Sequence, residues 1–460
     1  MGIAANLFHN PSNRENTLSY RIRPSETQVQ DQQERWNDLA DVLKDSLKSK
    51  FGKPVSSWLQ GSYKFGTQIR PARLKDEFDI DLGVYLEWRG SPEDEDVGAE
   101  ELKNEIQEIL KEYAADDSND SSEVTAPKMR CNRIRFADDF HIDIPSYHLD
   151  RDDDARELAT QNDEWENSDP KAIYIWWKDQ FDGPDRDRAR RLTRYFKMWA
   201  ALTFDGASRP SSILLTVLVA RTFGKADVDG LSGDDEFLRD AISGIRDRLT
   251  SSSVVRNPAN AAEDLNRLSE ADFQKLMDEL ESFLDTADRA LAATDEYESA
   301  DIWSEAFGHF FPFPEEDETQ SESAKSASGA VSFFRCDPDV KIVATAGKRR
   351  WDGFNEIGPI PRGCEISFSI VRPEDLPEGS QVTWTVRNEG PEAESVNDLG
   401  HLSGIGIRNT EKSAYKGNHF MDVVVKLNGR QIGRRRVRVR VSGLGIPLRN
   451  PRRPAWTKLR

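Results

Sequence analysis

Residues 78–84 read FDIDLGV, a run in which apolar and acidic side chains alternate. Successive side chains of a β-strand point to opposite faces, so this run predicts a strand with one apolar face and one acidic face. The apolar face carries Phe78, Ile80 and Leu82. The acidic face carries Asp79 and Asp81, whose carboxylates we expect to converge on one spot.

A second run, FHIDIPSY at residues 140–147, repeats the alternation. It turns its apolar side chains to one face, and His141 and Asp143 to the other. If the two strands are neighbours in one sheet, Asp143 joins Asp79 and Asp81.

Three carboxylates without a His or Cys ligand suit Mg²⁺, a hard cation that prefers oxygen ligands and keeps several waters. Two such ions, roughly 3.5–4 Å apart, can stabilise both the attacking and the leaving oxygen of a phosphoryl displacement. We therefore predict a site for two Mg²⁺ ions at Asp79, Asp81 and Asp143, with Mn²⁺ as the alternative ion.

The loop upstream of the first strand reads QGSYKFGT, at residues 60–67. Gly61 permits close approach of the backbone, and Ser62 offers N–H and hydroxyl donors to a phosphate. A lone Gly-Ser pair is more often a simple turn. Followed by three strand-borne aspartates, it indicates a site for nucleotide phosphates.

The rest of the chain divides by pattern. Helical spacing predicts an N-terminal helix that begins near Ser25, and residues 55–150 alternate strand-like runs with an amphipathic stretch. Residues 169–312 read as helices. Residues 314–330 lack large apolar side chains and read as a linker, and the short alternating runs beyond them are typical of a β-sandwich.

Composition narrows the function. The 460 residues include 63 basic and 82 acidic ones, a net charge of −19, which disfavours long nucleic acid as a partner. The chain has no apolar run near the ~20 residues of a membrane span. The widely spaced Cys131, Cys336 and Cys364 read as reduced thiols, so we expect a cytoplasmic protein without a membrane partner.

The motifs GSYKFGT, EFDIDLGVYL and FHIDIPSYHL resemble those of the nucleotidyltransferases related to cyclic GMP-AMP synthase and the bacterial dinucleotide cyclase, within the polymerase-beta-like superfamily. This resemblance implies an α+β fold. It also implies that Asp79 and Asp81 hold both metals and the donor triphosphate, and that Asp143 helps hold the metal that activates the acceptor hydroxyl. Ser62 with Gly61 would grip the donor's terminal phosphates.

The resemblance continues in RLTRYFKMWA and RPSSILLTVL, at residues 191–200 and 209–218, where the family places triphosphate contacts. It implies a set of nucleotide-binding residues: Gln60, Gly61, Ser62, Thr67, Lys197 and Ser211. Without the family, Lys197 would read as a solvated lysine beside an apolar stripe. Ser211 also reads as a helix N-cap after Pro210, a role compatible with anion binding.

The C-terminal runs resemble the sensor domain fused to such cyclases. There, Arg436, Arg438 and Arg440 alternate with valines and predict a cationic strand face, which is either a solvated surface or the site of an anionic trigger. Trp384 and His419 fit either the surface or the core of the sandwich.

The resulting domain scheme has five parts: a nucleotidyltransferase α/β core with its N-terminal helix (1–185), a helical nucleotide-binding subdomain (186–313), a linker (314–330), a sensor-like β-sandwich (331–445) and a basic tail (446–460). The resemblance implies an enzyme that makes a cyclic di- or oligonucleotide messenger from ATP, GTP or both, for a separate effector protein in antiphage signalling. The trigger of synthesis is unknown. Two alternatives stay open: a linear-oligonucleotide or RNA-tailing enzyme, and a non-catalytic nucleotide sensor.

Overall fold

The computed structural model describes residues 2–73, 76–116, 119, 121–136, 140–223, 233–314, 336–427 and 430–445. The chain forms two compact units, Met1–Phe307 with Phe311–Pro314, and Gly308–Phe310 with Glu315–Arg460. Most of the predicted linker and the whole basic tail lie outside the described residues. Within the described part, no helix has the length and apolar character needed to cross a bilayer.

The first unit is built on an eight-stranded mixed sheet. Its strands are β1 (Val55–Gln60), β2 (Phe78–Glu87), β3 (Ser121–Val124), β4 (Asn132–Phe136), β5 (Phe140–Ile144), β6 (Ser146–Asp150), β7 (Ala155–Ala159) and β8 (Trp165–Asn167). The order is β3-β4-β5-β2-β6-β7-β8, and β1 pairs with β2. The strands β5 and β6 are separated only by Pro145 and pair in parallel with successive halves of β2. The two predicted site strands are therefore neighbours.

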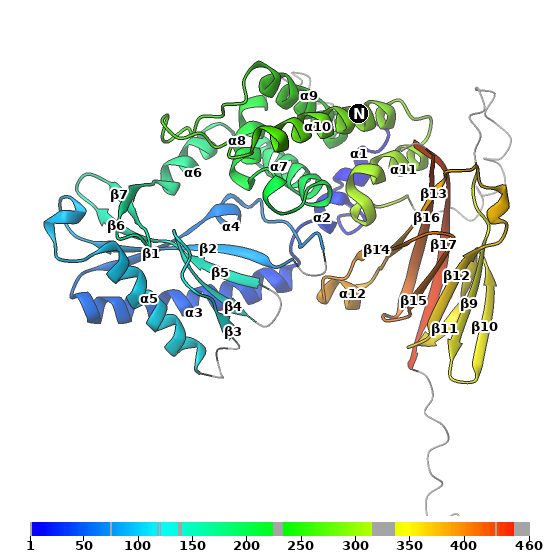
Figure 1. Ribbon diagram of the computed structural model, residues 1–460, viewed down its shortest axis with the longest axis horizontal. Coiled ribbons are helices and arrows are strands. Elements are labelled where there is room, and N and C mark those ends of the chain that lie inside the picture. Colours follow the sequence, from blue (N-terminus) through cyan, green and yellow to red (C-terminus); the bar gives the residue numbers. More distant parts are fainter. Residues whose placement is uncertain are drawn as a thin grey trace, which may run out of the picture. The chain divides into compact units, whose positions relative to one another are not determined.

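Two long helices, α3 (Glu26–Phe51) and α5 (Ala99–Ala114), cover one face of this sheet (Figure 1). The apolar side of β2 and leucines of α3 share one core. Ser25 caps α3 through a capping box, and Gly52 ends it with a positive φ, so the predicted start of the helix is confirmed. The opposite face of β2 and β5 is left for the polar side chains.

Helices make up the rest of the first unit. They are α4 (Gly61–Phe65), α6 (Pro170–Asp179), α7 (Gly183–Thr203), α8 (Ser212–Thr222), α9 (Asp234–Ser251), α10 (Glu270–Leu291) and α11 (Glu296–Phe307). The N-terminal α1 (Ala5–Phe8) and α2 (Leu18–Arg21) join them, since the Phe8 ring meets Tyr195 edge-on at 5.3 Å and Trp303 at 4.9 Å. The first residues of the chain thus help to fix α7 and α11.

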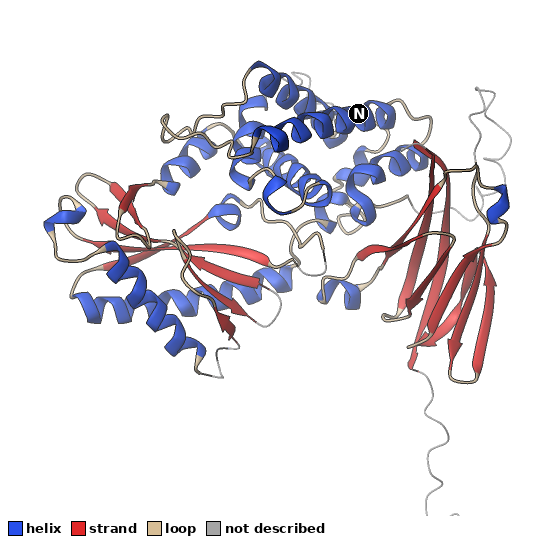
Figure 2. Cartoon of the chain, viewed as in Figure 1, coloured by secondary structure: helices blue, strands red, loops and turns tan. Residues whose placement is uncertain are grey.

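The described residues of the second unit are mainly strands, with one short helix, α12 (Pro391–Ser395) (Figure 2). Its two sheets have the orders β10-β9-β12-β15 and β11-β17-β16-β13-β14. The strands are β9 (Val340–Ala346), β10 (Arg349–Phe354), β11 (Glu356–Arg362), β12 (Glu365–Ile370), β13 (Gln381–Arg387), β14 (Gly400–Ile405), β15 (Arg408–Lys412), β16 (Gly417–Leu427) and β17 (Arg430–Gly445). Apolar side chains of both sheets form one core, so the predicted α+β fold with a C-terminal β-sandwich is confirmed. Trp384 and His419 are both buried.

The prediction that Arg436 contributes to a cationic face of β17 is wrong. Its side chain is only 12% exposed, and its guanidinium binds both carboxylate oxygens of Asp422, at 2.8 and 3.0 Å. Asp422 lies opposite Arg436 on β16, where it interrupts an apolar run. Strand alternation correctly gave the face, but it could not show that a neighbouring strand supplies a counter-ion. Of the three arginines, Arg440 is exposed.

Candidate active site

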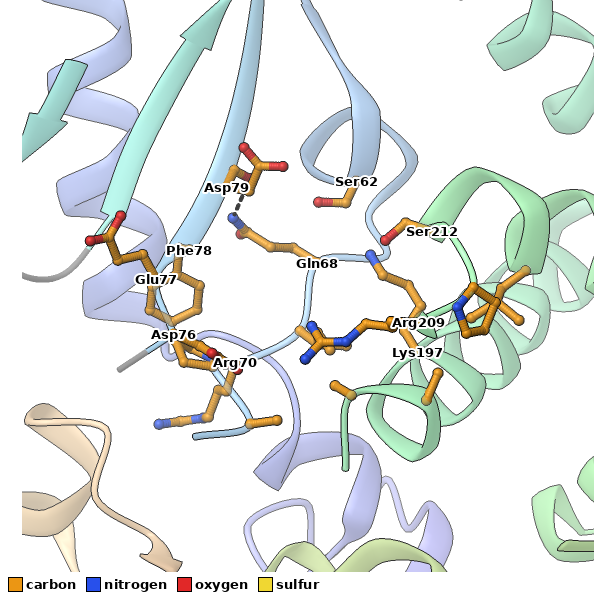
Figure 3. Close-up of a pocket in the computed structure, with 17 residues that line it drawn as sticks. Ser62, Gln68, Arg70, Asp76, Glu77, Phe78, Asp79, Lys197, Arg209 and Ser212 are labelled. Carbon is orange, nitrogen blue, oxygen red and sulfur yellow. Dashed lines mark hydrogen bonds between the residues drawn. The ribbon is translucent and has the colours of Figure 1, made fainter. Parts of the chain in front are cut away.

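The Gly61 loop, the sharp turn at which β1 ends at Gln60 and α4 begins, is shaped by Gly61, which has a φ of +54°. A Cβ added to Gly61 would lie 1.8 Å from an Asp81 carboxylate oxygen. Only glycine therefore allows the loop to lie directly against β2. The loop brings Ser62 to the wall of the same pocket as Asp79 (Figure 3).

The three predicted carboxylates come from two paired strands. Asp79 is in register with His141, and Asp81 with Asp143, along the parallel β2–β5 ladder. The burial pattern of β2 alternates as predicted, with Phe78, Ile80 and Leu82 buried. The acidic face of the sequence prediction is thus present, with its carboxylates on adjacent strands.

The charges at the site are unbalanced around Asp81. Burial, together with the neighbouring Asp79 and Asp143, raises the pKa of Asp81 well above its usual range. Asp143 differs: burial opposes its ionisation, yet the Arg133 guanidinium, with contacts of 2.5 and 2.8 Å, lowers its pKa. Arg133 sits opposite Asp143 on β4, and the sequence prediction missed it.

His141 also belongs to the site, which corrects the expectation of a cluster without histidine. Its Nδ1 lies 2.9 Å from Glu77 Oε2, and its Nε2 lies 3.0 Å from Asp79 Oδ1. Candidate ligand atoms of Asp79, His141 and Asp143 all lie within 4.8 Å of one another. The sequence did contain a signal for His141, because strand alternation places it on the same face of β5 as Asp143.

Lys197 on α7 is buried, not solvated as the alternative interpretation held. Its side chain is 7% exposed, and Nζ donates a hydrogen bond to the Thr67 carbonyl at 2.9 Å. Burial lowers its pKa to about 8, although Asp79 and Asp81 oppose that shift. A cation held in this way, with few partners to neutralise it, is well placed to receive an anionic ligand.

The other predicted nucleotide contacts have different surroundings. Ser211 caps α8 by accepting a hydrogen bond from the Leu214 amide, as the N-cap alternative required. Gln60 is buried, and its amide binds the hydroxyl groups of Tyr85 and Tyr147. The Gln60 side chain thus links the end of β1 to β2 and β6, just before Gly61.

A pocket of about 310 Å³ opens beside the carboxylates. Its walls come from the segment after α4, the start of β2, α7 and the start of α8 (Figure 3). Ser62, Asp79 and Lys197 line it, whereas Arg209 and Gln68 are lining residues that the sequence prediction missed. The Gln68 amide also donates a hydrogen bond to the Asp79 carbonyl, at 3.3 Å.

The residues of this site fit a divalent cation. A carboxyl group whose ionisation is opposed by burial and by neighbouring carboxylates, as that of Asp81 is, gains most from a positive ion nearby. The cluster of Asp79, His141 and Asp143 supplies two carboxylates and an imidazole to one place, and Asp81 lies in register with Asp143, two residues after Asp79.

Comparison with known proteins agrees with this geometry. The family profile described as "Cyclic GMP-AMP synthase DncV-like, nucleotidyltransferase domain" matches residues 55–147. The profile of the adenylyl/guanylyl and SMODS C-terminal sensor domain matches residues 330–442. The chain is 30% identical over 465 residues to a cyclic GMP-AMP synthase of Escherichia albertii, covering 98% of both proteins.

More distant relatives extend the comparison. A cyclic AMP-AMP-AMP synthase of an Acinetobacter species is 25% identical over 331 residues, which cover 68% of this chain and 88% of that protein. The crystal structure of the Vibrio cholerae DncV cyclic AMP-GMP synthase with a linear intermediate superposes with a TM-score of 0.56. At 19% identity, over 67% of this chain and 96% of that one, this likeness shows the fold.

The Gly-Ser segment and the strand-borne carboxylates all lie within the region that the nucleotidyltransferase profile matches. The chain belongs to the DncV-like family of nucleotidyltransferases, in the form that carries the C-terminal sensor domain. It is an enzyme whose relatives are synthases of cyclic di- and oligonucleotides.

Proposed function

We propose that this enzyme joins nucleoside triphosphates into a cyclic di- or oligonucleotide in a reaction that depends on Mg²⁺. The observation that carries the proposal is the register of β2 and β5, which places Asp79, Asp81 and Asp143 on one face opposite the Gly61 loop. The full-length likeness to a cyclic GMP-AMP synthase makes ATP and GTP the first substrates to test.

In this proposal Asp79, Asp81 and Asp143 hold the metal ions. Bound divalent ions would neutralise the crowded carboxylates and stabilise negative charge on the reacting phosphate. Ser62 and Lys197 are the phosphate-binding groups, because both line the pocket and the Lys197 ammonium donates a hydrogen bond to a neutral carbonyl, that of Thr67. Ser211 would act through the start of α8, where free amides and the helix dipole favour anions.

The alternatives differ in product. A linear-oligonucleotide or RNA-tailing enzyme would use the same carboxylates, but the net charge of −19 disfavours an RNA substrate. A non-catalytic sensor would need no retained carboxylate triad, whereas all three aspartates are present and adjacent. Cyclic synthesis therefore has the best support.

We place the enzyme in a cytoplasmic antiphage pathway in which its product activates a separate effector protein. The three cysteines are unpaired thiols, in keeping with a reducing compartment. The sandwich would receive the trigger of synthesis. A shortened protein ending at Lys325 should then retain its fold but lose the response to extracts of phage-infected cells.

The test is incubation of the purified full-length protein with all four nucleoside triphosphates, followed by mass spectrometry of the products. Parallel samples contain Mg²⁺, Mn²⁺ or a chelator, and an Asp41→Asn protein, altered at the surface of α3, serves as the matched control for Asp143→Asn. We expect a cyclic product with either metal from the wild type and the control. Linear products alone, or turnover in the chelator, would refute the proposal.

A further inference from the structure

His141 lies inside the carboxylate cluster and is nearly covered. It sits on β5 in register with Asp79 on β2, and its side chain shares the polar face with Asp143. The residue is 7% exposed. A buried imidazole beside carboxylates needs a partner for each ring nitrogen.

Only one ring nitrogen has such a partner. Nδ1 lies 2.9 Å from Glu77 Oε2, in hydrogen-bond geometry. Nε2 is buried and, among the described residues, has no partner in hydrogen-bond geometry, although Asp79 Oδ1 lies 3.0 Å away. If Nδ1 carries the proton toward Glu77, the Nε2 lone pair faces a carboxylate oxygen. Two electron-rich atoms at that distance repel each other unless a proton or a metal ion lies between or beside them.

This arrangement matches the way proteins prepare a metal-binding histidine. A ligating imidazole usually gives its other ring proton to a carboxylate, which fixes the tautomer and orients the ring. Glu77 is positioned for that role and is itself held by Arg135 at 3.3 Å. Candidate ligand atoms of Asp79, His141 and Asp143 lie within 4.8 Å of one another.

We infer that His141 Nε2 is a metal ligand beside Asp79 and Asp143, oriented by Glu77, and that the site consequently prefers Mn²⁺ to Mg²⁺. The inference deepens the proposed function and rests on it in one respect: both concern the same metal site. Both ions bind carboxylates, but Mn²⁺, a transition metal, accepts an imidazole nitrogen more readily than Mg²⁺, which strongly favours oxygen ligands. A cluster of carboxylates alone would not favour Mn²⁺ over Mg²⁺, because both ions bind carboxylate oxygens.

The competing explanation is that a protonated His141 bridges Glu77 and Asp79 as a structural ion pair. Both explanations predict that replacing His141 affects the fold. They differ in one property: only a ligand places its nitrogen in direct contact with a bound metal.

The experiment uses the full-length protein without nucleotide, loaded with one equivalent of Mn²⁺. Electron spin-echo envelope modulation detects a nitrogen bonded to Mn²⁺, and labelling histidine with ¹⁵N identifies it as imidazole. We expect the histidine signal in the wild type and in His9→Asn, a matched control outside the cluster. The signal should be lost in His141→Asn, whose amide keeps a donor for Glu77 but lacks Nε2.

Calorimetry on the same proteins measures the affinities for Mn²⁺ and Mg²⁺. Loss of a nitrogen ligand should weaken Mn²⁺ binding by roughly tenfold or more in His141→Asn and change Mg²⁺ binding by about twofold at most. Glu77→Gln should give a smaller loss in the same direction. If His141→Asn fails to fold, the ¹⁵N signal of the wild type still decides.

A wild-type protein that binds Mn²⁺ without a histidine signal, or an unchanged Mn²⁺ to Mg²⁺ ratio in folded His141→Asn, would overturn the inference. Neither measurement requires turnover. Failure to form a cyclic product would therefore refute the proposed function and leave the metal-ligand result standing.

Discussion

Asp81 is half-buried and Asp422 is buried, and their neighbours carry opposite charges. Asp81 lies among other carboxylates, and burial and repulsion raise its pKa. Asp422 is 1% exposed and binds three guanidiniums, those of Arg387, Arg434 and Arg436. Burial opposes its ionisation, yet Arg436 and Arg387 lower its pKa.

The difference separates a functional carboxylate from a structural one. Around Asp422 the chain supplies every counter-charge itself, so the folded protein needs no ligand there. Around Asp81 the positive charges of Lys197 and Arg133 are outweighed by burial and by the neighbouring carboxylates, which costs stability until a cation binds. We infer that unbalanced charge, more than burial, marks the site.

The strongest test of this comparison is the double change Asp79→Asn and Asp81→Asn. Neutral amides bind divalent ions poorly, so product formation should fall by roughly 10³-fold or more. The fold should persist, because two crowded carboxylates are removed. Product yield and circular dichroism check both expectations, and full turnover by the folded protein would rule out the metal role.

The change Asp422→Asn should have the opposite consequence. It leaves three guanidiniums together without their carboxylate, which should lower the unfolding free energy of the sandwich by about 3–5 kcal/mol. Urea denaturation measures the loss. The exposed Asp352, paired with Arg350, gives the control Asp352→Asn, for which we expect no measurable change. Equal stabilities for both variants would contradict the structural role of Asp422.

Gly61→Ala should damage the site through geometry. The new Cβ would collide with the Asp81 carboxylate, and the φ of +54° disfavours any side chain. We expect roughly 100-fold slower product formation. Gly52 has a φ of +64° with no described atom within 4 Å of an added Cβ. Gly52→Ala should therefore cost only about 1 kcal/mol of stability, and equal activities of the two variants would discount the collision.

Lys197→Met should separate binding from stability. Triphosphate affinity should fall by roughly tenfold to a hundredfold, because a charged hydrogen bond is lost. The folded-state pKa of about 8 lies below the ordinary 10.5, so the unfolded chain binds more protons between these values. Wild-type stability should thus rise with pH across that window, and at neutral pH Lys197 carries its full penalty.

Lys197→Met should consequently be at least as stable as the wild type at pH 7 and lack the rise between about pH 8 and 10.5. Thermal denaturation across pH, with the exposed Lys178→Met as control, measures both. If Lys197→Met showed the same dependence of stability on pH as the wild type, the rise could not be assigned to the buried Lys197 ammonium.

Much of the fold was predictable because local pattern and tertiary structure agree. The alternation in FDIDLGV and FHIDIPSY gave both site strands and their polar faces, and Ser25 marked the start of α3. The short alternating runs near the C-terminus gave the sandwich. In each case one face of an element packs on a core, so its sequence period is visible.

The misses share a different origin. Arg133 reaches Asp143 from β4, and Asp422 reaches Arg436 from β16, so each depends on strand pairing. The burial of Lys197 depends on the packing of α7 against the loop that carries Thr67. Alternation states which face a side chain takes, but it does not state what covers that face.

The most direct test is the effect of Asp81→Asn on stability with and without divalent metal. A raised carboxyl pKa means that the folded state loses stability as pH rises above the unfolded value, so at pH 7 Asp81 lowers the stability of the folded state. In a chelator, Asp81→Asn should therefore have a higher melting temperature than the wild type. With saturating Mn²⁺ or Mg²⁺, the wild type should gain more and the order should reverse. A variant that is less stable than the wild type in the chelator would contradict the claim that this cluster awaits a cation.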